Sequence, residues 1–160
     1  MNHNESIRSK IVTLPELMQK LQHREGETIV FTNGCFDIIH RGHVDYLSRA
    51  RDLGTKLVLG LNSDASVRRL KGESRPIVDQ QSRAFVLAGF QFIDYVVIFE
   101  EDTPFNLIST IQPDILVKGG DYKIENIVGH DIVEAHGGKV MTIPFVEGFS
   151  TTNIVNKMQQ

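Results

Sequence analysis

The sequence has few of the residues that mark specialised protein classes. It contains one cysteine, Cys35, and no tryptophan. A single cysteine excludes an intrachain disulfide and suits a reducing compartment, so we expect a cytoplasmic protein. No apolar run is long enough to span a bilayer, and the polar segment 1–6 lacks the apolar core of a signal peptide. We therefore expect no association with a membrane.

The charge balance also lacks a dominant sign. There are 17 Lys and Arg against 20 Asp and Glu, which gives a formal net charge of −3. This balance provides no overall attraction to nucleic acid, so any phosphate binding has to come from a local site. Walker A and G-x-G-x-x-G motifs are missing too, which argues against phosphoryl-transfer NTPases and dehydrogenases. The length of 160 residues predicts a single domain over 1–160, with 1–26 as an N-terminal extension carrying one helix.

Short apolar, β-prone runs alternate with amphipathic segments along the chain. The expected strands are 29–31, closed by an Asn33-Gly34 turn, and 56–61, 94–99, 114–118 and 139–144. A helix capped by Thr13 is expected before the first strand. Further helices are expected between the strands, including one capped by Asp79 and one capped by Thr103 with Pro104 at its first position. Residues 1–12 are weakly patterned. This alternation predicts an α/β fold, a Rossmann-like doubly wound parallel sheet of about five strands with helices on both faces. Ligands of such folds bind beyond the carboxyl ends of the strands, where the polar loops should meet.

One stretch, residues 28–43, combines a buried strand with two histidines at the start of a helix. Apolar residues recur at helical spacing from Val44 onward, so His40, Gly42 and His43 lie where the loop becomes the helix. Unpaired N–H groups and the positive end of the helix dipole favour an anion there, and a phosphate is the expected ligand. The two imidazoles lie on one side of the helical turn, and Gly42 lets a phosphate approach the backbone. The plainer alternative is a pair of surface histidines at a helix cap.

The segment Thr32-Asn33-Gly34-Cys35-Phe36-Asp37, followed by His40-Arg41-Gly42-His43, resembles the cytidylyltransferase-like nucleotidyltransferase superfamily with its HxGH signature. The Asn-Gly-Cys-Phe-Asp version is most similar to the heptose 1-phosphate adenylyltransferases of lipopolysaccharide core synthesis. Further blocks look like the same pattern, at 61–72, 99–104, 117–122 and 148–154. Where many cytidylyltransferases carry Arg-Tyr-Val-Asp-Glu-Val, this chain has Phe92-Ile93-Asp94-Tyr95-Val96, which weakens a cytidine interpretation.

The resemblance implies transfer of AMP from ATP to D-glycero-β-D-manno-heptose 1-phosphate, with release of pyrophosphate. Mg²⁺ is implied on the triphosphate, without a set of protein metal ligands. The implied catalytic residues are His40, His43 and Lys71. The implied nucleotide-binding residues are Thr32, Asn33, Gly34, Cys35, Phe36, His40, Gly42, His43, Lys118, Gly119, Ser150, Thr151 and Thr152. The implied substrate-binding residues are Asp37, Asn62, Asp64, Arg75 and Asp121.

Several alternatives stay open. The chain could be another nucleotidyltransferase, such as a glycerol-3-phosphate cytidylyltransferase, or a non-catalytic nucleotide-binding module that kept the fold. Asp37 could fix the loop or a histidine, Lys71 could be a solvated loop lysine, and Ser150 could be a simple N-cap. Arg83 is expected to be structural. Some relatives carry a sugar kinase ahead of this domain, and none is present here, so we expect a separate heptose kinase; a homodimer is a candidate assembly because relatives often pair.

Overall fold

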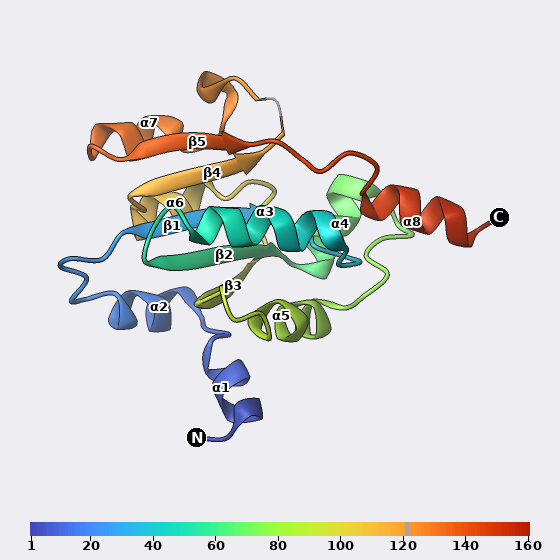
Figure 1. Ribbon diagram of the computed structural model, residues 1–160, viewed down its shortest axis with the longest axis horizontal. Coiled ribbons are helices and arrows are strands. Elements are labelled where there is room, and N and C mark those ends of the chain that lie inside the picture. The colour runs from blue at the N-terminus through green and yellow to red at the C-terminus, as the bar shows by residue number, and fades with distance from the viewer. Residues whose placement is uncertain (121) are drawn as a thin grey trace.

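The structure is a computed structural model that describes residues 1–120 and 122–160. Figure 1 shows one sheet with helices on both of its faces. The strands are β1 Ile29–Gly34, β2 Lys56–Asn62, β3 Tyr95–Phe99, β4 Ile115–Gly119 and β5 Lys139–Ile143. The helices are α1 His3–Ser9, α2 Leu14–Lys20, α3 Arg41–Arg51, α4 Asp64–Lys71, α5 Gln80–Ala88, α6 Phe105–Ile111, the 3₁₀ turn η1 Ile124–Asn126, α7 His130–Ala135 and α8 Thr151–Met158.

The sheet is parallel throughout, with the order β3-β2-β1-β4-β5. β1 lies at its centre, where Phe31 is in register with Val58 on β2 and with Leu116 on β4. The chain winds outward from β1 to β3 and then returns to the other side of β1 for β4. The strand order therefore reverses between β1 and β4, which is where such sheets bind ligands. The predicted doubly wound α/β fold is confirmed.

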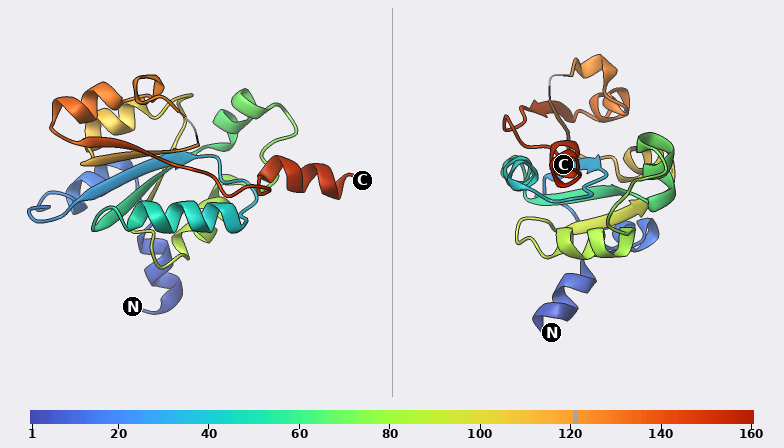
Figure 2. Two further views of the ribbon diagram at one scale, coloured as in Figure 1. Left: turned by 45° about the horizontal axis from the view of Figure 1, so that its top comes forward. Right: turned by 90° about the vertical axis from the view of Figure 1, so that its right-hand side faces the viewer.

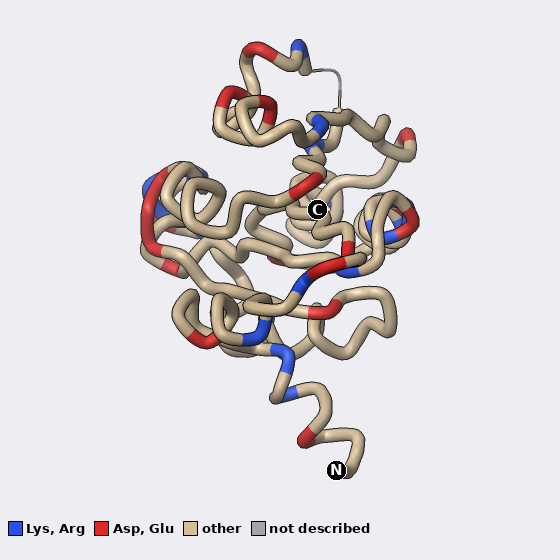
Figure 3. Tube along the Cα trace, turned by 90° about the vertical axis from the view of Figure 1, so that its left-hand side faces the viewer, with Lys and Arg blue, Asp and Glu red and all other residues tan. Residues whose placement is uncertain are grey.

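Each face of the sheet has its own apolar layer. Alternate residues of β1 point to opposite faces, so Val30 packs with α3 and α5 while Phe31 packs with α2, α6 and α7. Burial on both faces is why the strands have continuous apolar runs rather than alternating patterns. The end-on view of Figure 2 shows the sheet between these helices. In Figure 3 acidic and basic residues are interspersed along the chain.

Local capping signals correctly predicted several helix starts. Thr13 forms a capping box with Glu16, Asp79 accepts from the Ser82 N–H, and Ser150 accepts from the Asn153 N–H. These caps depend on residues three positions apart, so they are visible in the sequence. None of the helices that the structure describes is long and apolar enough to cross a membrane.

Three local predictions were wrong. Residues 3–9 form a regular helix, which Asn2 and Glu5 close with a second capping box; because it buries no residue, it has no apolar stripe to reveal it. Asn33-Gly34 does not end β1, since both residues pair with β2. Helix α6 has Pro104 as its N-cap without a side-chain hydrogen bond, so Thr103 does not cap it. The turn η1 was not anticipated either.

Candidate active site

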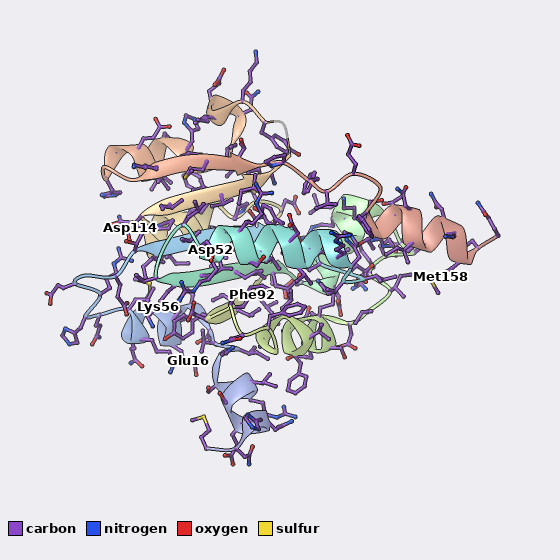
Figure 4. All side chains as sticks on the ribbon, viewed as in Figure 1. Glu16, Asp52, Lys56, Phe92, Asp114 and Met158 are labelled. Carbon is purple, nitrogen blue, oxygen red and sulfur yellow. The ribbon has the colours of Figure 1, made fainter. Side chains whose placement is uncertain are left out.

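A cleft of about 720 Å³ opens at the carboxyl ends of the strands. Figure 4 shows α8, with Met158 labelled, at the opposite end of the molecule from Asp114, which precedes β4. The cleft is lined by the loop after β1, the starts of α3 and α8, the segment after α4, and the end of β4. The predicted site residues that it brings together are Asn33, Gly34, Cys35, Phe36, Asp37, His40, Gly42, His43, Asn62, Lys71, Arg75, Lys118, Gly119, Ser150, Thr151 and Thr152.

His40 and His43 form a capping box at the start of α3. The Nδ1 atom of His40 accepts the Gly42 N–H at 3.0 Å, and the Nδ1 atom of His43 accepts the His40 N–H at 3.3 Å. The two rings stack with their centroids 3.9 Å apart and their planes at 27°. A Cβ atom at Gly42 would lie 2.9 Å from Cε1 of His40, so this arrangement requires glycine between the histidines.

The hydrogen bonds fix the tautomer of both rings. Because each Nδ1 atom accepts a backbone N–H, the proton of the neutral imidazole lies on Nε2. Burial lowers the pKa of His40, and burial together with the nearby His40 ring lowers the pKa of His43 to about 4. Both rings are therefore neutral near pH 7 and offer Nε2–H groups as donors. Positive charge in the cleft has to come from other residues, namely Lys71, Arg75 and Lys118.

A nitrogen-detected NMR titration is expected to find His43 as the neutral Nε2–H tautomer down to about pH 4. The same histidine in the urea-unfolded chain should titrate near pH 6.5, its ordinary value. The unfolded state therefore binds more protons between these two pH values, so stability should fall as the pH drops through this window. A proton on Nδ1 of His43, or an ordinary pKa in the folded chain, would contradict this prediction.

Aromatic rings enclose the histidine pair. Phe36 meets the His43 ring edge-on at 5.3 Å, and Phe149, from the loop after β5, stacks toward His40 at 6.2 Å between centroids. These rings contribute to the burial that lowers the pKa values of both imidazoles. The sequence interpretation missed the part played by Phe149, although it lies inside the 148–154 block.

Tyr46 is a second residue that the interpretation missed. Its hydroxyl lies 2.6 Å from Oγ1 of Thr32 and donates to the Val117 carbonyl at 3.3 Å. It thereby ties α3 to β1 and β4 one helical turn beyond His43. The Thr32 side chain is buried in this contact and does not line the cleft. The implied contact of Thr32 with the nucleotide, largely through its backbone, stays a prediction.

Arg83 is structural, as expected. Its side chain is fully buried, and its Nη1 atom donates to the carbonyls of Cys35 and Asn62 at 2.6 and 2.9 Å. Its Nη2 atom pairs with the Asp64 carboxylate at 2.7 Å. Asp64 does not line the cleft, and Arg83 holds its carboxylate. Its implied contact with substrate stays a prediction.

Asp37 is fully occupied by the protein. Its carboxylate accepts from Arg75 Nε at 2.7 Å, from the Ile77 N–H at 2.9 Å and from the Val78 N–H at 2.9 Å. Asp37 therefore fixes the loop, as one of the two alternatives held. Its implied contact with substrate stays a prediction. Asp121, also predicted to bind substrate, lies outside the described residues.

The start of α8 lies beside the histidine pair, where Phe149 approaches the His40 ring. Ser150 is the N-cap of α8, as the plainer alternative held. The Thr151 hydroxyl donates to the Ile38 carbonyl at 3.0 Å, and this hydrogen bond ties α8 to the loop before α3. The N–H groups of Thr151 and Thr152 belong to the first helical turn, which has no intrahelical acceptor for them. These N–H groups can therefore bind an anion in the cleft.

The cleft contains neither a reactive thiol nor, among the described residues, a metal-binding cluster. Burial raises the pKa of the Cys35 thiol, so it is protonated and a poor nucleophile near pH 7. Within residues 1–120 and 122–160 no group of three or more His, Cys, Asp or Glu side chains is arranged to hold a metal ion. The cleft is equipped to bind and orient phosphates rather than to form a covalent intermediate.

A parallel α/β sheet with paired histidines at the helix that follows its central strand defines a nucleotidyltransferase-type domain. The Cytidylyltransferase-like family matches residues 31–157, and the chain belongs to this family. The predicted superfamily is thereby confirmed. Among relatives, the chain is 60% identical over 139 residues to "Bifunctional protein HldE" of Syntrophotalea carbinolica, covering 87% of this chain and 28% of that protein.

Other comparisons agree. "Bifunctional protein HldE" of Campylobacter concisus is 58% identical over 150 residues, covering 94% of this chain and 31% of the relative, so the chain spans less than a third of these proteins. The lipopolysaccharide core biosynthesis protein from Thermoplasma volcanium superposes with a TM-score of 0.62 at 28% identity, over 76% of this chain and 98% of that one. Pantothenate synthetase from Thermus thermophilus, at 18% identity and a TM-score of 0.59 over 91% of this chain and 67% of that one, shares the fold.

Proposed function

We propose that this chain transfers AMP from ATP to D-glycero-β-D-manno-heptose 1-phosphate, giving ADP-heptose and pyrophosphate. The observation that carries the proposal is the pair of neutral Nε2–H donors of His40 and His43 in a cleft at the sheet's switch point. The resemblance of Asn33–Asp37 to heptose 1-phosphate adenylyltransferases supports the acceptor. The likeness to a protein named for lipopolysaccharide core biosynthesis points in the same direction.

The chemistry needs no protein nucleophile. An oxygen of the sugar phosphate attacks the α-phosphorus in line, and the bond from that phosphorus to the bridging oxygen of pyrophosphate breaks. Charge builds on the leaving pyrophosphate, where the Nε2–H groups of His40 and His43 would donate hydrogen bonds. The N–H groups of Thr151 and Thr152, at the neighbouring helix start, would also hold the phosphates. Catalysis then consists of positioning the two substrates and stabilising charge.

A divalent cation, Mg²⁺ in this proposal, would neutralise part of the triphosphate charge. Mg²⁺ commonly binds through substrate phosphates and few protein ligands, which fits a cleft whose described residues lack a carboxylate–histidine cluster. The residues of this chain would then orient the phosphates. A half-buried free thiol at Cys35 suits the reducing cytoplasm. The sugar 1-phosphate has to be supplied by a sugar kinase activity. A homodimer stays part of this proposal.

The test is a pyrophosphate-release assay that offers ATP, CTP or GTP against both anomers of heptose 1-phosphate and against glycerol 3-phosphate. We expect turnover with ATP and the β-anomer of the heptose. Product only with CTP would make the chain a cytidylyltransferase. Absence of turnover with every pair, in a chain that still binds nucleotide, would favour the non-catalytic module.

A further inference from the structure

We infer that Arg75 binds the phosphate of the acceptor sugar and that Asp37 is the residue that positions it. This inference rests on the proposed function, which it deepens by assigning the two substrates to different walls of the cleft. It starts from an ion pair at the cleft that is almost completely buried. The side chain of Asp37 is 0% exposed and that of Arg75 is 12% exposed, with Nε and Oδ2 2.7 Å apart.

The segment that carries Arg75 is fastened at two further points. The Asp37 carboxylate also accepts the N–H groups of Ile77 and Val78, so one side chain holds the segment by three donors. The Val78 carbonyl accepts from Nε of Arg83 at 2.8 Å, and Arg83 also donates to the Cys35 carbonyl. The segment 75–78 is therefore bound to the loop after β1, which leads directly to the histidines. Such fastening preorganises the guanidinium before substrate arrives.

The two terminal nitrogen atoms of the Arg75 guanidinium, Nη1 and Nη2, are available to bind a ligand. Nε is used by Asp37, and in the part of the chain that the structure describes no acceptor lies within hydrogen-bond distance of Nη1 or Nη2 of Arg75. Arg75 lines the cleft. A planar fork of N–H groups matches two oxygens of one phosphate, and a phosphate monoester has such oxygens free at its end.

The charge distribution assigns this fork to the acceptor. The wall formed by the starts of α3 and α8 contributes neutral donors, the histidine Nε2–H groups and backbone N–H groups. The wall formed by the end of α4 and the following segment contributes two cations, Lys71 and Arg75. The reaction has to bring a sugar phosphate dianion against a polyphosphate, so a cation on the incoming phosphate offsets their repulsion. The triphosphate would meet the neutral wall together with its own metal ion.

The ion pair is charged over the whole range in which the enzyme would work. Burial by itself would raise the pKa of Asp37, but the hydrogen bonds from Ile77, Val78 and Arg75 outweigh it and hold this pKa below its ordinary value. Because the folded pKa is lowered, the contribution to stability is present above the ordinary carboxyl range and is lost as the pH falls through the folded pKa. The charged groups next to the carboxylate are Arg75 and, through Val78, Arg83.

The experiment compares kinetic constants for the two substrates. Arg75→Gln should raise KM for heptose 1-phosphate by about 10- to 100-fold, the loss expected when hydrogen bonds to a charged group disappear, and should leave KM for ATP within about twofold. Arg75→Lys, which keeps the charge without the fork, should fall between. Arg68→Gln is the matched control, because Arg68 is exposed on α4 and outside the cleft.

The positioning role of Asp37 has its own readouts. Asp37→Asn should raise KM for the acceptor, and it should add little in an Arg75→Gln background, because both changes act through one guanidinium. The Arg75 Nε–H resonance should be protected from solvent exchange in the parent chain and lose protection in Asp37→Asn. Since Asp37→Asn also loosens the 75–78 segment, its melting temperature is measured beside Arg75→Gln, which leaves the carboxylate's backbone contacts in place.

Three outcomes would overturn the inference. One is an unchanged KM for the acceptor in Arg75→Gln, another is an equal rise in both KM values, and the third is full additivity of the two changes. An inactive parent chain would instead remove the proposed function. In that case calorimetric titration of heptose 1-phosphate into the chain loaded with α,β-methylene-ATP tests whether Arg75 binds the acceptor phosphate. Weaker binding by Arg75→Gln than by the parent chain supports the inference. Equal binding by both chains, or no binding by the parent chain, refutes it.

Discussion

Replacing His43 by alanine is expected to lower kcat by about 10²- to 10³-fold, the usual cost of removing one preorganised donor from a site where charge develops. The substitution removes an Nε2–H group from the cleft and one hydrogen bond, the one from the His40 N–H. A single bond of this kind contributes about 1 kcal/mol to stability, so the fold should persist. Steady-state pyrophosphate release gives kcat, and thermal unfolding checks the fold.

Two further substitutions make this prediction specific. His43→Gln retains an amide N–H that can reach toward the phosphates, so it should lose less activity than alanine. His23→Ala, at an exposed turn outside the cleft, should leave kcat unchanged. A fully active His43→Ala enzyme would show that the histidine pair has no part in catalysis, and the proposed mechanism would then fail.

Replacing Arg83 by methionine is expected to destabilise the protein by about 3–5 kcal/mol, the typical cost of removing one partner of a buried ion pair. The methionine leaves the Asp64 carboxylate without its partner, and the carbonyls of Cys35, Asn62 and Val78 without their donor. These groups lie in four segments around the cleft, namely the end of β2, the start of α4 and the loops that carry Cys35 and Val78. The substitution should therefore also loosen the walls of the cleft. Urea unfolding monitored by circular dichroism measures the change.

Arg49→Met provides the control for this measurement. Arg49 forms an exposed ion pair with Asp45 one turn away on α3, with Nη1 and Oδ2 3.4 Å apart, and exposed pairs contribute at most about 1 kcal/mol. Adding Asp64→Asn to Arg83→Met should recover part of the stability, because it removes the unpaired charge. If the two arginine variants unfolded at the same urea concentration, Arg83 would not be the structural residue that its burial indicates.

Patterns that repeat over a few residues carried the fold prediction. Alternating apolar runs and amphipathic segments predicted five parallel strands with helices on both faces, and caps at Thr13, Asp79 and Ser150 were visible because donor and acceptor lie three positions apart. The same locality placed His40 and His43 at the start of a helix. A helix without a buried face, such as α1, gives no such stripe and was missed.

The sequence by itself determined the order of the elements, the family and the position of the histidine pair, because each depends on neighbours along the chain. Only the tertiary structure decided which polar side chains remain available to a ligand. Asp37, Asp64 and Thr32 look alike in the sequence as candidates, yet Arg75, Arg83 and Tyr46 occupy them. Such partners meet through the winding of the sheet. A buried polar group bonds to whatever donor the fold brings within about 3 Å, and no local pattern encodes that.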